Sequence, residues 1–348
     1  MPGSTDGASF AEEVAKVAMD PHRTFRRVPL APHQLLKKIT AQRDLFVLAH
    51  VGIPRIDPKT WTLGVGGLVA RGASFSYDRL RALPKKEVEA FHQCAGYPAN
   101  PRIATRRVGN VVWGGVDLKT LLEGTGVLPE ARFLWSFGLD HGEYDGIRSG
   151  PYLKDMPLDR IESGGVILAY EVNGEPLDAE HGFPLRLVVP GYYGTNSVKW
   201  LFRLGLADRR AEGPFTTQLY NDPVGPTPEN PRGSTRPVWQ VAPESVIVNP
   251  APDSQVGGGP LEIWGWAWAD GGVAAVDIST DGGRTWRGAK LDAQTGWSWQ
   301  KFRETWQPEG EGEAVLMSRA AGKLGAVQPD ADWRNAVHAV RVVKTGRT

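Results

Sequence analysis

The spacing of apolar residues predicts strands throughout the last third of the chain. LEIWGWAW at 261–268 alternates with period two, which is typical of a half-buried strand. AAVDIST at 274–280 leads into an Asp-Gly-Gly turn signal at 281–283, and WSWQKF, AVLMSRA and AVHAVRVV add further runs at similar spacing. We therefore predict an antiparallel, immunoglobulin-like sandwich.

The first two thirds of the chain mix two periodicities. WTLGVGGLV at 61–69 and GNVVWGGV at 109–116 have the character of strands, whereas SYDRLRAL at 76–83, DLKTLLEG at 117–124 and PLDRIES at 157–163 have helical spacing. Short helices and strands alternate irregularly, and no G-x-G-x-x-G turn follows a strand, so a Rossmann domain is not expected. The pattern predicts a compact α+β domain.

A proline-rich segment separates these two parts. Residues 221–237, NDPVGPTPENPRGSTRP, contain five prolines and two glycines. Proline at this density cannot join a helix or a central strand, so the segment is predicted to be a linker. Of the 13 tryptophans, nine lie from Trp239 onward, and this change in composition at the linker supports a domain boundary.

Composition excludes several classes of protein. A formal net charge of +1 argues against a nucleic-acid partner, and no apolar run is long enough for a membrane helix. The N-terminal residues lack the apolar core of a signal peptide, so we expect a cytoplasmic location, or a periplasmic one if a leader has been removed. A single cysteine excludes an intramolecular disulfide, a Cys-rich zinc module and an iron–sulfur cluster.

That cysteine, Cys94, lies in the loop sequence FHQCAGYPANPRIATRRVGN at 91–110. A loop thiol among arginines has a setting that favours the thiolate, which can act as a nucleophile, a redox thiol or a soft metal ligand. Simple packing is the alternative, because free cysteine is among the most buried residue types. The loop sequence by itself leaves both interpretations open.

A second group of candidate residues lies in two adjoining stretches, 166–191 and 192–204. They contain His181, Arg186 and Lys199 in a backbone interrupted by glycines. Such side chains, together with backbone N–H donors, suit a bound phosphate or another fixed anion. A salt-bridged surface hairpin is the alternative interpretation.

Five motifs, taken in order, carry a family resemblance. Cys-Ala-Gly is followed by VGNVVWGGVDL, AYEVNGEPL, HGFPLRLVVPG and SVKWL. This series is similar to the sulfite oxidase family of molybdopterin enzymes, from about Phe46 to the C-terminus. The resemblance implies four parts: an N-terminal extension at 1–45, a molybdopterin-binding catalytic domain of α+β class at 46–222, the linker at 223–237, and an all-β, immunoglobulin-like dimerisation domain at 238–348.

The resemblance also implies roles for individual residues. Cys94 matches the thiolate that ligates molybdenum, which suits a soft metal centre. His50 matches a histidine beside the pterin, and Tyr220 matches an active-site tyrosine. The positions that match the family's contacts to the pterin and its phosphate are Asp140, His181, Arg186, Ser197 and Lys199.

Two substrate-binding arginines of the family are absent. Leu48 stands where the family has an oxyanion-binding arginine, and Ala99 ends the Tyr-Pro-Ala run that replaces Asn-Arg-Arg. Three arginines of the same loop could compensate: Arg102, Arg106 and Arg107. A shortened late motif, DWRNAVHAV, leaves Arg334 as a further candidate. We therefore take Arg106 and Arg334 as candidate catalytic arginines, and the cofactor is better supported than the substrate.

The expected activity is oxidation of sulfite, or a related small oxyanion, to sulfate, with molybdenum and molybdopterin as cofactors. The 45 residues before Phe46 are too few for the cytochrome domain of animal family members, so we expect a separate electron acceptor, either a cytochrome c or dioxygen. The resemblance implies a homodimer through the C-terminal domain.

Three other functions stay open at this point. An S- or N-oxide reductase would use the same cofactor. A zinc hydrolase would use Cys94 with His50, His92 or His181, although these spacings fit no local zinc motif. A non-enzymatic carbohydrate-binding or adhesion protein would rest on the Trp-rich sandwich and on STDGGRTW, which matches an Asp-box turn, and it predicts exposed tryptophans.

Overall fold

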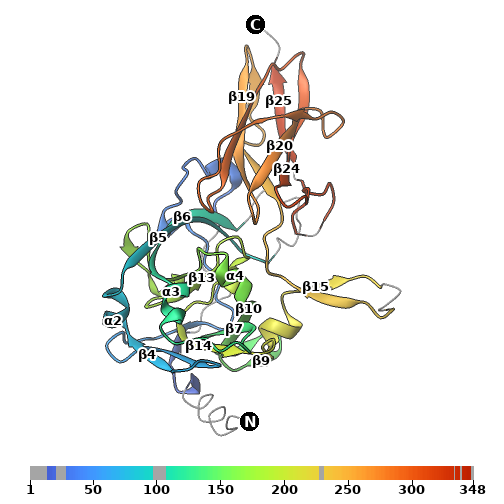
Figure 1. Cartoon of the computed structure of the whole chain (residues 1–348). Coiled ribbons are helices and arrows are strands. Elements are labelled where there is room, and N and C mark those ends of the chain that lie inside the picture. The colour runs from blue at the N-terminus through green and yellow to red at the C-terminus, as the bar shows by residue number, and fades with distance from the viewer. Residues whose placement is uncertain are drawn as a thin grey trace.

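A computed structural model describes residues 14–20, 29–96, 107–226, 231–332, 334–337 and 339–345. Two five-stranded sheets form the lower body of the molecule in Figure 1. The first sheet has the order β10 (Tyr152–Pro157), β7 (Phe133–Gly138), β14 (Leu201–Ala207), β3 (Thr62–Gly67) and β4 (Ala73–Ser76). The second has the order β12 (Glu175–Pro176), β11 (Ile167–Val172), β6 (Val108–Asp117) and β5 (Lys85–Gln93), with β13 (Arg186–Val188) also paired to β11.

The hydrophobic core of this body joins the two sheets. Leu63 of β3 and Leu204 of β14 belong to the same buried cluster as Leu168 of β11 and Leu187 of β13. Each of these side chains is at most 1% exposed, which is the burial expected where two apolar sheet faces meet. Strand β3 lies within the predicted run 61–69, and β6 contains the predicted run 109–116 and extends one residue beyond each end.

Three short helices begin where the sequence predicted them: α2 (Tyr77–Arg81), α3 (Leu118–Glu123) and α4 (Leu158–Glu162). Ser76 and Asp117 cap the first two by accepting hydrogen bonds from backbone N–H groups three residues later, at 3.2 and 3.1 Å. The helices have only five or six residues, so the domain is mostly β, with less helix than an even α+β mixture would have. No helix of the described residues is long and apolar enough to cross a membrane.

The C-terminal part, orange to red in Figure 1, is a two-sheet sandwich. One sheet has the order β17 (Glu244–Asn249), β19 (Leu261–Trp268), β23 (Gln300–Trp306) and β22 (Lys290–Leu291). The other has the order β18 (Gln255–Gly257), β25 (Ala339–Thr345), β24 (Gly312–Gly322), β20 (Val273–Ser279) and β21 (Arg287–Gly288). Ile263 and Phe302 of the first sheet meet Ile278, Leu316 and Val340 of the second in one buried cluster. The strand predicted at 261–268 is confirmed.

The proline-rich segment connects the two parts but is not an extended linker. It forms a hairpin of β15 (Asn221–Val224) and β16 (Ser234–Pro237), which pair only with each other and project from the body (Figure 1). A two-stranded ribbon can contain prolines because its outer edges need no ladder hydrogen bonds. The expectation that this segment joins no central strand is met.

Tryptophans of the sandwich pack against the N-terminal body. Trp266 donates its indole N–H to the carbonyl of Leu35 at 2.7 Å, and Trp268 donates to Oε1 of Gln93 at 2.7 Å. Both indoles and Trp299 are at most 5% exposed and share one cluster with Phe91 of β5 and Val108 of β6. The carbohydrate-binding hypothesis predicted exposed tryptophans, and for these three it is wrong, because they form the interface between the two parts.

Candidate cofactor site

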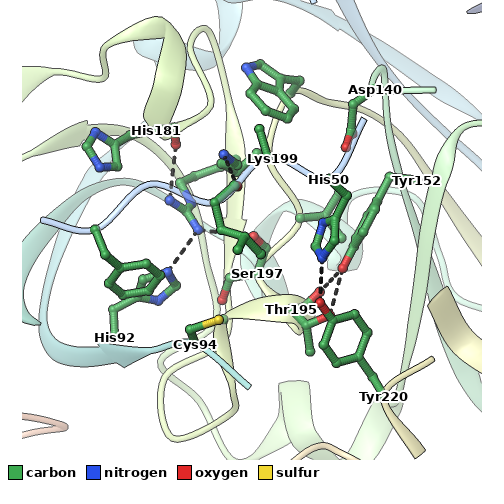
Figure 2. Close-up of a pocket in the computed structure, with 17 residues that line it drawn as sticks. His50, His92, Cys94, Asp140, Tyr152, His181, Thr195, Ser197, Lys199 and Tyr220 are labelled. Carbon is green, nitrogen blue, oxygen red and sulfur yellow. Dashed lines mark hydrogen bonds between the residues drawn. The ribbon is translucent and has the colours of Figure 1, made fainter. Parts of the chain in front are cut away.

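One pocket of the N-terminal body collects eight of the predicted site residues (Figure 2). The space between its lining atoms, including the part that is open to solvent, is about 600 Å³. The eight residues come from strand ends and connecting loops rather than from strand centres: His50, Cys94, Asp140, His181, Arg186, Ser197, Lys199 and Tyr220. In the view of Figure 2, Cys94 and Tyr220 lie along the lower side, and His181, Lys199 and Asp140 along the upper side.

Cys94 directly follows the last residue of β5. Its backbone N–H donates to the carbonyl of Arg107 at 2.9 Å, which extends the β5–β6 pairing by one bond, and its Sγ accepts from the N–H of Gly96 at 3.3 Å. The preceding residue, Gln93, is fixed by Trp268 and by Glu244, whose carboxylate accepts from the Gln93 amide at 2.5 Å. The thiol is therefore held at the pocket wall by strand pairing on one side and by the sandwich on the other.

His50 and Tyr220 form a close pair next to the thiol. Nε2 of His50 lies 2.5 Å from Oη of Tyr220. Burial, assisted by the positive charge of Lys199, lowers the pKa of His50 to about 3, so the imidazole is neutral near pH 7. Burial also raises the pKa of Tyr220 well above its ordinary value, so the phenol keeps its proton. We call Cys94, His50 and Tyr220 the thiol end of the pocket.

Arg186 and His181 lie on the other side. Arg186 donates through Nη1 to the carbonyl of His181 and through Nη2 to that of Ser197, both at 3.1 Å. Burial lowers the pKa of Arg186 to about 9, which still leaves it cationic near pH 7. Asp178 lies 2.8 Å from Nδ1 of His181 and so orients the imidazole. Nε of Arg186 and Nε2 of His181 are buried without a hydrogen-bond partner.

Lys199 and Asp140 complete this side. Nζ of Lys199 donates to the carbonyls of Leu48 at 2.9 Å and Glu180 at 2.8 Å. Burial raises the pKa of the Asp140 carboxyl and lowers that of Lys199. A Cβ at Gly138 would lie 2.6 Å from Oδ1 of Asp140 and 2.7 Å from the Lys199 carbonyl, so only glycine fits there. We call Asp140, His181, Arg186 and Lys199 the anchoring end.

The unpartnered polar atoms test whether a cofactor fits the anchoring end. Oδ1 of Asp140, Nε2 of His181 and Nε of Arg186 are all buried without a hydrogen-bond partner among the described residues, and each such atom costs roughly 1–3 kcal/mol. A ligand with both N–H donors and anionic oxygens would satisfy them. A pterin that carries a phosphate has both, and the thiol at the other end suits a soft metal. The residues present therefore fit a metal-bearing pterin.

Comparison with known proteins decides the family. Residues 50–215 match the oxidoreductase molybdopterin binding domain, and residues 235–343 match the Mo-co oxidoreductase dimerisation domain. The chain is 34% identical over 330 residues to the sulfite oxidase of Gallus gallus. The alignment covers 86% of this chain and 70% of that protein. The chain belongs to the sulfite oxidase family.

Other relatives agree with this assignment. The chain is 32% identical over 338 residues to the mitochondrial sulfite oxidase of Homo sapiens, covering 88% of this chain and 60% of that protein. The crystal structure of the sulfane dehydrogenase SoxCD from Paracoccus pantotrophus superposes with a TM-score of 0.74 at 28% identity, over 97% of this chain and 92% of that one. This sulfite oxidase family member is therefore an oxidoreductase whose cofactor is molybdopterin with molybdenum.

Of the two arginines predicted to be catalytic, Arg106 and Arg334, the structure describes only Arg334. Arg106 lies outside the described residues, as do Arg102 and Ala99. Arg334 does not line the pocket: it forms an ion pair with Asp222 and donates through Nη1 to the carbonyl of Ala95 at 2.9 Å. It therefore contacts the Cys94 loop from the sandwich side.

Several pocket residues were missed by the sequence analysis. Tyr152 on β10 places Oη 2.7 Å from Oγ1 of Thr195, and both line the pocket. No motif distinguishes Tyr152 from an ordinary core tyrosine. The zinc alternative has no support among the described residues, where no three His, Cys, Asp or Glu side chains group as metal ligands.

Proposed function

We propose that this chain oxidises sulfite, or a related small oxyanion, to sulfate and passes the electrons to a separate acceptor. One observation carries the proposal. The pocket has a thiol at one end and unpartnered buried groups that suit an anionic pterin at the other. When bound, the molybdenum group supplies the two-electron redox chemistry and the exchange of an oxygen atom.

The anchoring end would hold the cofactor. Arg186 and Lys199 would bind the phosphate by charge and hydrogen bonding, with His181 donating or accepting at Nε2. Asp140 would accept an N–H of the pterin at Oδ1, and Ser197 keeps the backbone in place because its Oγ accepts from the N–H of Val189 at 3.1 Å. Cys94 at the other end would be the protein ligand to molybdenum.

His50 and Tyr220 would control one proton beside the substrate. With its proton on Nε2, the neutral imidazole of His50 can donate to Oη of Tyr220, which lies 2.5 Å away. This contact fixes the direction of the phenol, whose own O–H can then donate to an oxyanion next to Cys94. Tyr152, Thr195 and the aromatic rings around His50 close this side against water.

The architecture supports further parts of the proposal. We propose the domain limits 46–222 and 238–348, with the hairpin segment 223–237 between them and residues 1–45 as an N-terminal extension. The two-sheet sandwich supports an immunoglobulin-like domain, and its match to a dimerisation domain supports a homodimer. A cytochrome c or dioxygen would take the electrons. The cytoplasmic location stays a prediction.

Metal analysis and steady-state kinetics test this function. The protein, produced in a host that makes the cofactor, should contain about one molybdenum per chain and should reduce ferricyanide when sulfite is added. Cytochrome c and dioxygen should then be compared as acceptors. Stoichiometric zinc without molybdenum would contradict the proposal. Failure of the molybdenum-loaded protein to oxidise sulfite would also contradict it.

Oxidation of sulfane sulfur is a second candidate. It is favoured by the similarity to the sulfane dehydrogenase SoxCD and by Leu48, a partly buried apolar residue where the resemblance implies an oxyanion-binding arginine. Thiosulfate, whose outer atom is sulfane sulfur, separates the candidates. Faster turnover of thiosulfate than of sulfite by the same preparation would favour this second activity.

A further inference from the structure

Among the described residues that line the pocket, none supplies a positive charge at the thiol end. Leu48 lines the pocket with an apolar side chain, and its backbone carbonyl accepts from Lys199 of the anchoring end. Arg186 and Lys199, the two cations of the pocket lining, belong to the anchoring end and donate to protein carbonyls. A small dianion beside Cys94 therefore needs a cation from outside this lining.

Arg107 places its guanidinium next to the thiol. It is the residue before β6, and its carbonyl accepts from the N–H of Cys94 at 2.9 Å. A Cβ built on Gly96 would lie 3.4 Å from Nη1 of Arg107 and 3.4 Å from Sγ of Cys94. The guanidinium and the sulfur thus both lie next to the position that a side chain of residue 96 would occupy, and glycine has no side chain to separate them.

The positive charge of Arg107 also acts on Tyr220 of the thiol end and on Tyr144, which packs against His50. Burial raises the pKa of Tyr220 and of Tyr144, and the charge of Arg107 works against that rise at both phenols. Tyr144 packs edge-on against His50, with ring centres 4.8 Å apart, and Tyr220 contacts His50 directly. Arg107 is therefore close to the wall that contains Cys94, Tyr220 and His50.

Two other described cations near this wall have different positions. Lys154 is 1% exposed and donates to the carbonyl of Phe215 at 2.9 Å, behind Tyr220. Arg334 is held by Asp222 and by the carbonyl of Ala95. Neither is among the nearest neighbours of the Gly96 position that Arg107 shares with the thiol.

We propose that Arg107 binds the anionic substrate beside Cys94 and replaces the arginines that the family resemblance implies at positions 48 and 99. The inference rests on the proposed function, because it names the group that recognises the substrate of that same site. It also makes a claim that needs no substrate: the region around Cys94 attracts anions.

The single cysteine allows this claim to be measured on the full chain without cofactor. Iodoacetate and iodoacetamide both alkylate the Cys94 sulfur and release iodide, but only iodoacetate is an anion. The ratio of their rate constants cancels differences in accessibility and thiolate fraction. Arg107→Gln should lower this ratio by about 3- to 10-fold at low salt, as expected for one charge at a few ångström in a solvent-rich setting. Arg107→Lys should stay near the wild-type ratio.

Arg287→Gln is the matched control, because it removes the same charge from an exposed position on β21. Its ratio should equal that of the wild type. An unchanged ratio in Arg107→Gln, with thermal unfolding like that of the wild type, would overturn the proposal. If Arg107→Gln does not fold, the wild type alone provides the test. Its ratio of iodoacetate to iodoacetamide rate constants should be higher in the folded protein than in urea, and an equal or lower ratio would overturn the proposal.

Kinetics of the molybdenum-loaded enzyme complete the test. Arg107→Gln should raise the KM for sulfite about 10-fold or more with a small change in kcat, and Arg107→Lys should recover part of the loss. An unchanged KM would overturn the substrate-binding role. If the wild type does not oxidise sulfite while the alkylation ratio still falls in Arg107→Gln, the proposed function fails and the anion-attracting role of Arg107 stands.

Discussion

The two ends of the pocket are built in different ways. Three of the four residues of the anchoring end lie within 20 residues of sequence, from His181 to Lys199, and they are held by carbonyls of neighbouring loops. The thiol end is assembled from segments far apart in the chain, with Cys94 after β5, Tyr220 after the turn at 214–218 and His50 from the N-terminal side. The sandwich also reaches it through Trp268 and Arg334.

The two ends also differ in how closely their residues follow the family resemblance. The anchoring end keeps the motif residues and fits a pterin phosphate. The thiol end keeps the cysteine that we propose as the metal ligand and the tyrosine, but the pocket has Leu48 where the resemblance implies an arginine. The comparison predicts that variants of the anchoring end change cofactor binding, and that variants of the thiol end change turnover.

The largest effect is expected for Cys94→Ser. A hydroxyl is a poor ligand for a soft metal but is close in size to a thiol, so the fold should remain. Loss of a group that only hydrogen-bonds to a metal ligand costs about 10- to 100-fold in activity, so loss of the ligand itself should lower kcat by more than about 100-fold. Steady-state kinetics with sulfite, normalised to molybdenum content, measures the effect. Wild-type turnover would mean that the thiol serves only in packing.

Lys199→Met should lower the fraction of chains that contain cofactor rather than the kcat of the loaded enzyme. Loss of a charge-assisted hydrogen bond to the phosphate should cost about 1.5–3 kcal/mol of cofactor binding, or roughly 10- to 150-fold in affinity. The cofactor-free chain should change by only about 1 kcal/mol, or roughly 2–4 °C in Tm, because burial already disfavours the ammonium. Molybdenum content and calorimetry give the two values. Lys290→Met, which changes an exposed lysine on β22, is the control. Full cofactor occupancy in Lys199→Met would show that the phosphate binds elsewhere.

The contribution of the sandwich to the thiol end is tested by Trp268→Phe. The change leaves Oε1 of Gln93 without its indole donor, at a cost of about 1–3 kcal/mol in unfolding free energy. The loosened loop should also let iodoacetamide react faster with Cys94. Trp286→Phe removes an indole hydrogen bond to the Gly283 carbonyl, remote from the pocket, and should leave the alkylation rate unchanged. Equal rates in both variants would show that the sandwich does not position the loop.

The smallest effect is expected for Tyr220→Phe. Only one hydrogen bond to the substrate is lost, so kcat should fall by about 2- to 10-fold while molybdenum content stays constant. Tyr77→Phe, which removes a hydroxyl outside the pocket, should have no effect on kcat. A large loss of molybdenum in Tyr220→Phe would show that this tyrosine contributes to cofactor binding, as we propose for the residues of the anchoring end.

Much of this architecture could be predicted from the sequence. The three helices have capping or apolar spacing signals within a few residues of their ends, and β19 spans the predicted run 261–268, although residues 265–268 are all buried. Eight predicted site residues line one pocket, and five of them lie in the short, contiguous motifs that carry the resemblance: Cys94, His181, Arg186, Ser197 and Lys199.

The remaining features depend on tertiary contacts. WSWQKF predicts a strand from 297, but β23 begins at Gln300 because Trp297 pairs with Ala90 of β5 and Ser298 bonds to Glu89. The position of Arg107 depends on the backbone bond that closes the Cys94 loop. No local pattern contains such information, because both partners must first be brought together by the sheets.

The sulfur ligation of molybdenum tests the central claim most directly. X-ray absorption at the molybdenum edge should count one sulfur neighbour fewer in Cys94→Ser than in the wild type, with the pterin still bound through the anchoring end. An identical sulfur count in the two proteins would contradict the assignment of Cys94 as the metal ligand and, with it, the division of the pocket into a thiol end and an anchoring end.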